Sequence, residues 1–221
     1  MSSHHPPSAV RHSPILKWLG QVDYEPTWRA MQAFTDSRDA QSDDQIWFLE
    51  HPPVFTLGLN AAREHVLAPG TIPVVQIDRG GQVTYHGPGQ LVVYPLLNVK
   101  RLGLGVRALV MALENAVIRW VATRNVVAES RRDAPGIYVE GRKLASIGLR
   151  IRRGCSYHGL AFNIAMDLGP FLRINPCGYQ GLQVVDLKSL GIETDVASVA
   201  KGLAPHLLHA LDFAADPRWI D

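Results

Sequence analysis

Apolar residues gather in short blocks along this chain, and polar, glycine or proline residues separate one block from the next. Blocks of this length that are rich in valine, isoleucine, leucine and tyrosine predict β-strands. The predicted strands are Ile15–Val22, Gln45–Leu57, Ile72–Ile77, Leu91–Leu97, Gly136–Glu140, Leu144–Ile151 and Gly159–Ile164. Only a short turn containing Gly141 separates the strand that ends at Glu140 from the next, which indicates a hairpin.

Other segments have apolar residues three and four positions apart, and this spacing predicts helices. These segments are Pro26–Arg38, Val106–Arg124 and Asp195–Leu211. The second has one apolar face, which should cover a sheet and consists of Leu109, Leu113, Val117 and Trp120. Because the strands cluster between the helices without regular alternation, we expect an α+β fold with mixed β-sheets flanked by helices. A doubly wound nucleotide-binding fold is not expected.

Length and composition limit the class of protein. The chain has 221 residues, of which 47% are hydrophobic and 19% are charged, and its formal net charge is +2. This is enough for one substantial core, so we expect a single domain over residues 14–221 and a disordered tail over residues 1–13. The sequence has neither a run of about 20 apolar residues nor the hydrophobic stretch of a signal peptide. We therefore expect a cytoplasmic protein without a membrane segment.

Two reactive residues lie in glycine-rich sequence. Lys143 follows Gly141 and Arg142, and Cys177 stands between Pro176 and Gly178. A cysteine forms a thioester only as the thiolate, and a nearby lysine can hold the displaced proton. In water, proton transfer from a thiol to a neutral lysine amine is favourable by about 2.6 kcal/mol. The two residues together predict an acyltransferase with a Cys/Lys pair.

Each of these residues also has a more ordinary interpretation. A lone cysteine in a cytosolic protein is most often a small buried hydrophobic residue, and a lysine on a hairpin is most often a solvated cation. The Pro-Cys-Gly sequence favours Cys177 as a nucleophile, because such a turn suits a special backbone geometry better than a core strand. The run from Ser146 to Ile151 predicts a central strand and places Lys143 at its mouth.

A third segment, from Arg79 to Gln90, alternates polar residues with glycine just before a predicted strand. Glycine lets a backbone approach a ligand closely, and Arg79, Thr84 and His86 supply hydrogen-bonding groups. The segment therefore predicts a loop that cradles a substrate. Candidate side chains for an apolar slot beside this loop are Leu57, Leu59, Tyr85, Leu149 and Phe162.

The run Arg79–Tyr94 meets in full the pattern Arg-Gly-Gly-x-x-Thr-aromatic-His-x-x-Gly-Gln-x-x-x-Tyr. By this run, together with Gly141–Gly148, Tyr157–Asn163 and Asn175–Gln183, the chain resembles the lipoyl(octanoyl) transferases. That family belongs with the lipoate and biotin protein ligases in one structural family. The resemblance extends over most of the chain between residues 14 and 212.

The resemblance implies a catalytic domain of the biotin/lipoate protein ligase type and a transfer in two steps without a cofactor. An octanoyl group would pass from acyl carrier protein to Cys177, the nucleophile, with Lys143 as general acid/base. It would then pass to a lysine on a lipoyl domain of a 2-oxoacid dehydrogenase or on the glycine cleavage H protein. The implied substrate-binding residues are Arg79, Gly80, Gly81, Gln82, Val83, Thr84, Tyr85, His86, Ser146, Ile147, Gly148, Gly159, Leu160 and Ala161.

Histidines leave the identity of the base open on the residues alone. Histidine is the commoner partner of a catalytic thiol, and both His86 and His158 are candidates, although the resemblance assigns His86 to the acyl-binding wall. Cys155 and His158 form a Cys-x-x-His pair. A structural zinc site needs four ligands, so we expect no metal and interpret Cys155 as a reduced, packed thiol.

Basic residues suggest how a partner would be attracted. They occur at Arg131-Arg132, Arg142-Lys143 and Arg150-x-Arg152-Arg153, and would steer an acidic carrier protein toward the site. The small net charge does not favour nucleic acid as a partner. Two other functions stay open: an ATP-dependent lipoate ligase of the same fold, which would need no thiol, and a non-catalytic module that binds lipoyl domains.

Overall fold

The computed structural model describes residues 13–176, 181–214 and 218–220. The strands are β1 (Ile15–Gln21), β2 (Gln45–Glu50), β3 (Val54–Leu57), β4 (Val74–Gln76), β5 (Val83–His86), β6 (Gln90–Leu96), β7 (Glu129–Ser130), β8 (Gly136–Val139), β9 (Arg142–Arg152), β10 (Cys155–Asn163) and β11 (Arg218–Ile220). The α-helices are α1 (Tyr24–Ser37), α2 (Val106–Ala122) and α3 (Val196–Ala210). Short 3-10 helices are η1 (Arg63–His65), η2 (Gly169–Arg173) and η4 (Lys188–Leu190).

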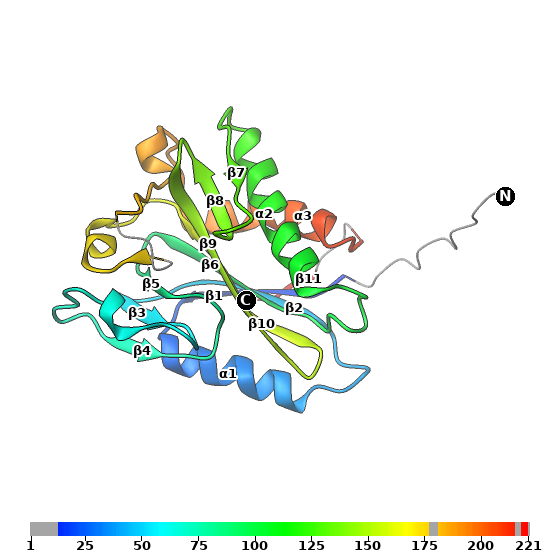
Figure 1. The fold of residues 1–221 in the computed structure, drawn as a ribbon. Helices are drawn as coiled ribbons and strands as arrows, with labels where there is room; N and C mark the ends of the chain where they lie inside the picture. Colours follow the sequence, from blue (N-terminus) through cyan, green and yellow to red (C-terminus); the bar gives the residue numbers. More distant parts are fainter. Residues whose placement is uncertain (1–12, 177–180, 215–217, 221) are drawn as a thin grey trace.

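The centre of the fold is a mixed eight-stranded sheet in the order β11-β1-β2-β6-β10-β9-β8-β7. The neighbours β11, β1 and β2 run parallel, and the other neighbouring pairs are antiparallel. A smaller sheet has the order β4-β3-β5. Strand β10 comes late in the sequence but lies between β6 and β9, in the middle of the large sheet (Figure 1).

Helices cover both faces of the large sheet. In Figure 1, α2 and α3 lie on one face, and α1 lies on the other, next to the smaller sheet. The main core lies on the first face, where apolar residues of β2, β6 and β10 meet those of α2 and α3. The predicted apolar face of α2 is confirmed, because Leu109, Leu113, Val117 and Trp120 are all buried. The α+β class with mixed sheets and flanking helices is therefore confirmed.

One predicted strand is wrong as a single element. The apolar run Gln45–Leu57 forms two strands, because β2 ends at Glu50 and β3 begins at Val54 in the other sheet. The break falls at Pro52 and Pro53. Proline has no N–H group for a strand ladder, so two prolines in succession end the pairing and let the chain change sheets.

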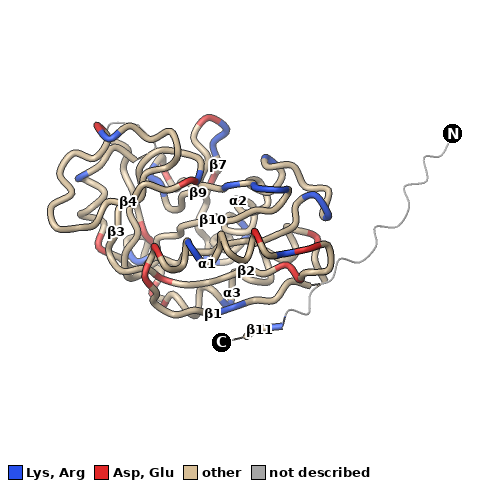
Figure 2. The backbone as a smooth tube through the Cα atoms, turned by 90° about the horizontal axis from the view of Figure 1, so that it is seen from below, with Lys and Arg blue, Asp and Glu red and all other residues tan. Residues whose placement is uncertain are grey.

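Charged residues are distributed over many elements, and basic and acidic positions are interspersed (Figure 2). Arg142 pairs with Glu140 at 2.7 Å, and Arg152 pairs with Asp36 at 3.2 Å. The basic clusters expected to attract a carrier protein are therefore partly neutralised by acidic neighbours. Within the described ranges, no helix has the combined length and apolar character that a bilayer crossing requires.

Candidate active site

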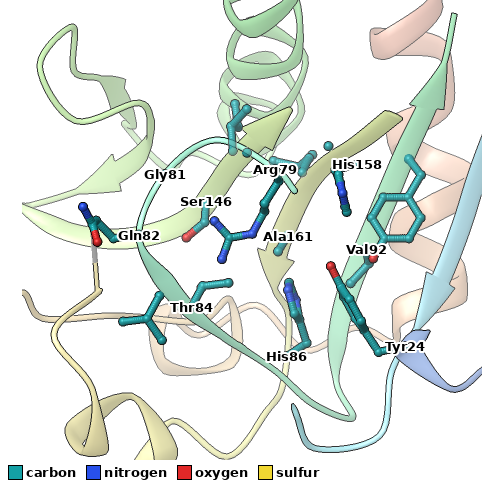
Figure 3. A pocket seen from close by; sticks show the side chains of 16 residues that line it. Tyr24, Arg79, Gly81, Gln82, Thr84, His86, Val92, Ser146, His158 and Ala161 are labelled. Carbon is teal, nitrogen blue, oxygen red and sulfur yellow. The ribbon is translucent and has the colours of Figure 1, made fainter. Parts of the chain in front are cut away.

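A cavity lies where the smaller sheet and the start of α1 meet the middle of the large sheet (Figure 3). It contains about 490 Å³ of empty space, part of which is open to solvent. Strands β5, β6, β9 and β10 all contribute to its wall. The lining residues are Tyr24, Arg79, Gly81, Gln82, Val83, Thr84, His86, Val92, Tyr94, Ser146, Ile147, Gly148, His158, Gly159, Leu160 and Ala161.

The fold brings most of the predicted substrate-binding residues together. Three segments that are far apart in sequence, 79–86, 146–148 and 159–161, meet at this one cavity. From the first segment, Gly80 and Tyr85 are not in the lining. Tyr85 instead packs against Phe55 and Phe171 on the far side of β5. None of the side chains suggested for an apolar slot lines the cavity; Leu59, for example, is 53% exposed.

Arg79 lies in the middle of the cavity wall with its guanidinium group fixed (Figure 3). Nη2 donates to the carbonyl oxygen of Thr56 at 2.8 Å and to its Oγ1 at 3.0 Å, and Nη1 donates to the Gly80 carbonyl at 2.9 Å. The side chain is buried. The cavity therefore holds an oriented positive group, which is suited to polarising a carbonyl or binding an anionic oxygen.

His86 is held by both ring nitrogens. Nδ1 lies 2.8 Å from Oε1 of Gln90, and Nε2 lies 3.4 Å from Oγ1 of Thr56. An amide oxygen only accepts, so Nδ1 carries the proton. Burial holds the pKa of His86 well below 6.5. His86 is therefore a neutral, fixed part of the cavity wall.

His158 is tied to Asp78 at one end of the cavity. Nε2 of His158 lies 2.9 Å from Oδ1 of Asp78, which also accepts from Trp28 Nε1 at 2.9 Å, while Tyr157 donates to Oδ2. Burial alone would raise the pKa of Asp78, but the hydrogen bonds from His158 and Tyr157 hold it well below its usual range. Burial also lowers the pKa of His158. Its Nδ1 is then a buried acceptor that has no hydrogen-bond partner in the described part of the chain.

A second buried chain of hydrogen bonds supports the same end of the cavity. His51 Nδ1 lies 2.6 Å from the Val22 carbonyl oxygen, and Nε2 lies 2.8 Å from the Tyr94 hydroxyl. The carbonyl only accepts, so Nδ1 carries the proton and the Tyr94 hydroxyl donates to Nε2. The ring of His51 also packs against the ring of Tyr24 at the start of α1, with the ring centroids 4.9 Å apart. These residues hold the helix against β6.

Lys143 lies at the beginning of β9, directly after the predicted hairpin turn. Its side chain is only 2% exposed, and Nζ donates to the Pro135 carbonyl oxygen at 3.2 Å and faces the ring of Tyr138. Lys143 does not line the cavity itself. It precedes Ser146, which does, by three positions on the same strand, a distance of about 10 Å.

Cys177 lies outside the described residues, so its distance from Lys143 is not given by the structure. The chain that follows it returns to Lys143. The Lys143 N–H donates to the Gln183 carbonyl oxygen at 2.8 Å, and the Val185 N–H donates to the Lys143 carbonyl oxygen at 3.0 Å. The other cysteine, Cys155, is a free thiol buried at the start of β10. In the described ranges, no group of three or more His, Cys, Asp or Glu residues could hold a metal ion.

Several residues of the site were not identified from the sequence. Asp78, His51 and Tyr24 lie outside the motifs, and only the fold brings them together. Tyr94 is the last residue of the motif that begins at Arg79, but the motif gives it no role. Glu114 could have been identified from the sequence, because it is a charged residue beside Leu113 on the predicted apolar face of α2. It is buried, and its Oε1 accepts a hydrogen bond from the Gly136 N–H at 3.0 Å.

This fold and cavity define a catalytic domain of the lipoyl protein ligase A/B class. Residues 23–208 match the family model of the lipoyl protein ligase A/B catalytic domain, and the chain belongs to this family. Within it, the chain is similar to curated octanoyltransferases. It is 57% identical to the one from Alkalilimnicola ehrlichii over 206 residues, which are 93% of this chain and 95% of that protein. The octanoyltransferase of Xylella fastidiosa is 56% identical over 211 residues, covering 96% and 92%.

Solved structures share the fold at much lower sequence identity. A lipoate-protein ligase A bound with ATP has a TM-score of 0.76 at 14% identity, covering 95% of this chain and 90% of that chain. A biotin protein ligase from Aquifex aeolicus has a TM-score of 0.55 at 12% identity, covering 90% and 69%. These likenesses concern the fold alone.

Proposed function

We propose that this protein is an octanoyltransferase of protein lipoylation. In this proposal it moves an octanoyl group from acyl carrier protein, through a thioester on Cys177, to a lysine amine of a lipoyl domain. The observation that carries the proposal is the buried amine of Lys143 at the start of the strand that lines the cavity. The similarity to octanoyltransferases over nearly the whole chain supports the same activity.

The first step forms the acyl-enzyme. The thiolate of Cys177 attacks the thioester carbonyl carbon, while Lys143, as an ammonium group, holds the proton that the thiol has lost. The bond to the sulfur of the carrier breaks, and the departing thiolate takes that proton from Lys143. The carrier leaves as a thiol, and Lys143 is left as a neutral amine.

The second step uses that neutral amine as a base. The amine of the acceptor lysine attacks the Cys177 thioester and transfers a proton to Lys143. Cys177 leaves as a thiolate, which restores the thiolate and ammonium pair. Conversion of a thioester to an amide is strongly favourable, so the reaction needs no nucleotide.

The cavity supplies the binding wall for the acyl group. Ile147, Leu160 and Val92 provide apolar surface, and the fixed guanidinium group of Arg79 provides a polar group for the carbonyl end. Among the fold neighbours, an archaeal bipartite lipoate protein ligase was studied with its E2 lipoyl domain, and this supports a lipoyl domain as the acceptor. The need for a reduced thiol favours the cytoplasm.

The first prediction concerns the acyl-enzyme. After incubation with octanoyl-acyl carrier protein and without ATP, intact-mass spectrometry should find one octanoyl group on the wild-type protein and none on Cys177→Ala. Cys155→Ala is the matched control and should still be acylated, because burial raises the pKa of the Cys155 thiol.

Lys143→Ala should slow both half-reactions by about 100-fold or more, as for the loss of a general acid/base.

Other results would point elsewhere. An unmodified wild-type protein after long incubation would contradict the proposal. Octanoylation of a lipoyl domain from free octanoate only when ATP is added would identify a ligase. Binding of a lipoyl domain without transfer under either condition would identify a non-catalytic module.

A further inference from the structure

Glu114 is an acidic residue that is buried beside the apolar core. It lies in the middle of α2, and its neighbours Leu113, Ala116 and Val117 belong to the main core. Glu114 itself is 6% exposed. A buried carboxylate is costly unless it is hydrogen-bonded and its charge is compensated. Its Oε1 accepts the Gly136 N–H at 3.0 Å, which meets the first requirement.

The charge of the Glu114 carboxylate is compensated through the segment that contains Gly136. Lys143 packs against this segment, because Nζ donates to the carbonyl oxygen of Pro135 at 3.2 Å. A Cβ atom at position 136 would lie 2.7 Å from Cε of Lys143 and 3.2 Å from Nζ. The Pro135–Gly136 segment therefore contacts both charged groups. The Gly136 N–H group donates to the Glu114 carboxylate, and the Pro135 carbonyl oxygen accepts from the Lys143 ammonium group.

Electrostatic attraction between the two charged groups accompanies this contact. Burial raises the pKa of Glu114, and the Gly136 N–H and the positive charge of Lys143 both oppose that rise. The other groups near Lys143 are different in kind. Tyr138 of β8 turns its ring toward Nζ, and Arg131, which pairs with Glu129, lies over the same ring. Arg142 is paired with Glu140, and the returning chain contributes Gln183, which has no charge.

We propose that Glu114 is a positioning residue of the acyl-transfer site. Its carboxylate anchors the Pro135–Gly136 segment against α2 and favours the charged form of the Lys143 amine. The inference rests on the proposed function, in which Lys143 shares a proton with Cys177. A nearby negative charge helps Lys143 to hold the thiol proton in the first step. It also makes the neutral amine a stronger base toward the acceptor in the second step.

Glu114→Gln separates the charge from the hydrogen bond. The amide oxygen still accepts the Gly136 N–H, so the segment keeps its anchor, but the negative charge is gone. The alkaline limb of the pH profile of kcat/KM for octanoyl transfer should move down by about one pH unit, as expected for loss of a nearby opposite charge. At pH values above the alkaline limb, kcat/KM of the variant should be about tenfold lower than that of the wild type.

The matched control is Glu193→Gln. Glu193 is an exposed glutamate just before α3, so this variant makes the same change of charge at the surface. Its pH profile should be that of the wild type. Glu114→Asp keeps a carboxylate and should keep the wild-type alkaline limb, even if the shorter side chain lowers the rate. An unchanged limb in Glu114→Gln would overturn the inference.

A measurement without any change at Glu114 makes the test independent of how its variants fold. Coupling between two sites is reciprocal, so removing the amine should affect the carboxylate. In Lys143→Met, the midpoint of the Glu114 carboxyl titration, followed by its carboxyl 13C shift, should rise by about one pH unit. An unchanged midpoint would contradict the inference.

The outcomes for the two proposals differ. If Lys143→Ala transferred octanoyl groups at the wild-type rate, the proposed role of Lys143 would be wrong whatever Glu114 does. If Lys143→Ala were inactive but Glu114→Gln kept the wild-type profile, the proposed function would stand and only the role of Glu114 would be lost.

Discussion

Room for the buried amine of Lys143 depends on a missing side chain at Gly136. A Cβ atom there would lie 2.6 Å from the Ala145 carbonyl oxygen as well as 2.7 Å from Cε of Lys143. The backbone of Gly136 also has φ = +144°, a conformation that residues with a side chain rarely adopt. Position 136 therefore sets where the lysine amine can lie.

Gly136→Ala should reduce acyl transfer much more than it reduces the folded fraction. The added methyl group displaces the Lys143 side chain, and a displacement of about 1 Å in a reacting group can cost about 100-fold in rate. Single-turnover formation of the acyl-enzyme measures the effect, and circular dichroism verifies that the variant is folded. In the control, Gly105→Ala, the new methyl group meets no atom within 4 Å, so a comparable loss there would contradict this explanation.

For single residues, the position on a strand could be predicted from the sequence, but burial and neighbours could not. The motif and the hairpin were sufficient to place Lys143 at the start of a strand, and this is confirmed. The depth of its burial and its proximity to Glu114 depend on how α2 packs against β8, and no local pattern reports that packing. The position of Cys177 relative to Lys143 stays a prediction.

At the level of elements, the contact between β10 and β6 depends on Gly159. A Cβ atom at this position would lie 2.1 Å from the Val93 carbonyl oxygen and 2.6 Å from Cδ of Pro95. Both contacts are on β6, the neighbouring strand in the sheet. The two strands approach here more closely than a side chain would allow, and this is where β10 enters the wall of the cavity.

Gly159→Ala should lower the free energy of unfolding by about 2 kcal/mol, in the range found for overpacking of a core. The backbone of β6 cannot move aside without disturbing its pairing with β2 as well. Urea denaturation measures the change, and Gly105→Ala, on the open loop before α2, again serves as the control. Equal stability of the two variants would mean that the strands separate at little cost.

The elements themselves were largely predictable. Helices α2 and α3 and the hairpin of β8 and β9 appear where apolar spacing and turn residues predicted them. The apolar run Gln45–Leu57 predicts one strand but forms two, because Pro52 and Pro53 interrupt it. Which strands become neighbours was not predictable, because β10 pairs with β6 across a long stretch of sequence.

For the molecule as a whole, buried histidines predict a loss of stability in mild acid. Burial lowers the pKa of His51 from 6.5 to about 4, and it also lowers the pKa of His86 and His158. Below pH 6.5 the unfolded chain takes up protons that the folded protein does not, so acid favours unfolding. Each such histidine contributes about 1 kcal/mol per pH unit in this range.

Other titrating groups change this slope little. Asp78, whose pKa is lowered, adds stability that is lost only below its usual value of 3.8. Glu114, whose pKa is raised, acts in the opposite direction but is a single group. The thermal midpoint should therefore fall between about pH 7 and about pH 5. The fall should be less steep in His51→Gln and unchanged in His209→Gln, which alters an exposed residue of α3. Equal slopes in all three proteins would show that His51 takes up its proton in the folded state.

The class of fold was predictable at this scale because a mixed order of strands and helices excludes most alternatives. The cavity was predictable only in part. Motif residues identified three segments of its wall, while the contributions of α1 and β6 through Tyr24 and Val92 depend on layer packing. The family assignment agrees with the resemblance read from the motifs.

The position of β10 between two strands that precede it in sequence has a consequence for biosynthesis. A nascent chain that has left the ribosome as far as Arg152 already contains β6 and β9 but not the strand that joins them. Without β10, strands β2 and β6 have no pairing with β9, and the cavity lacks the part of its wall that residues 158–161 supply. The wall proposed to bind the acyl group is therefore complete only after residues 155–163 have been translated, and a shorter polypeptide lacks the complete cavity.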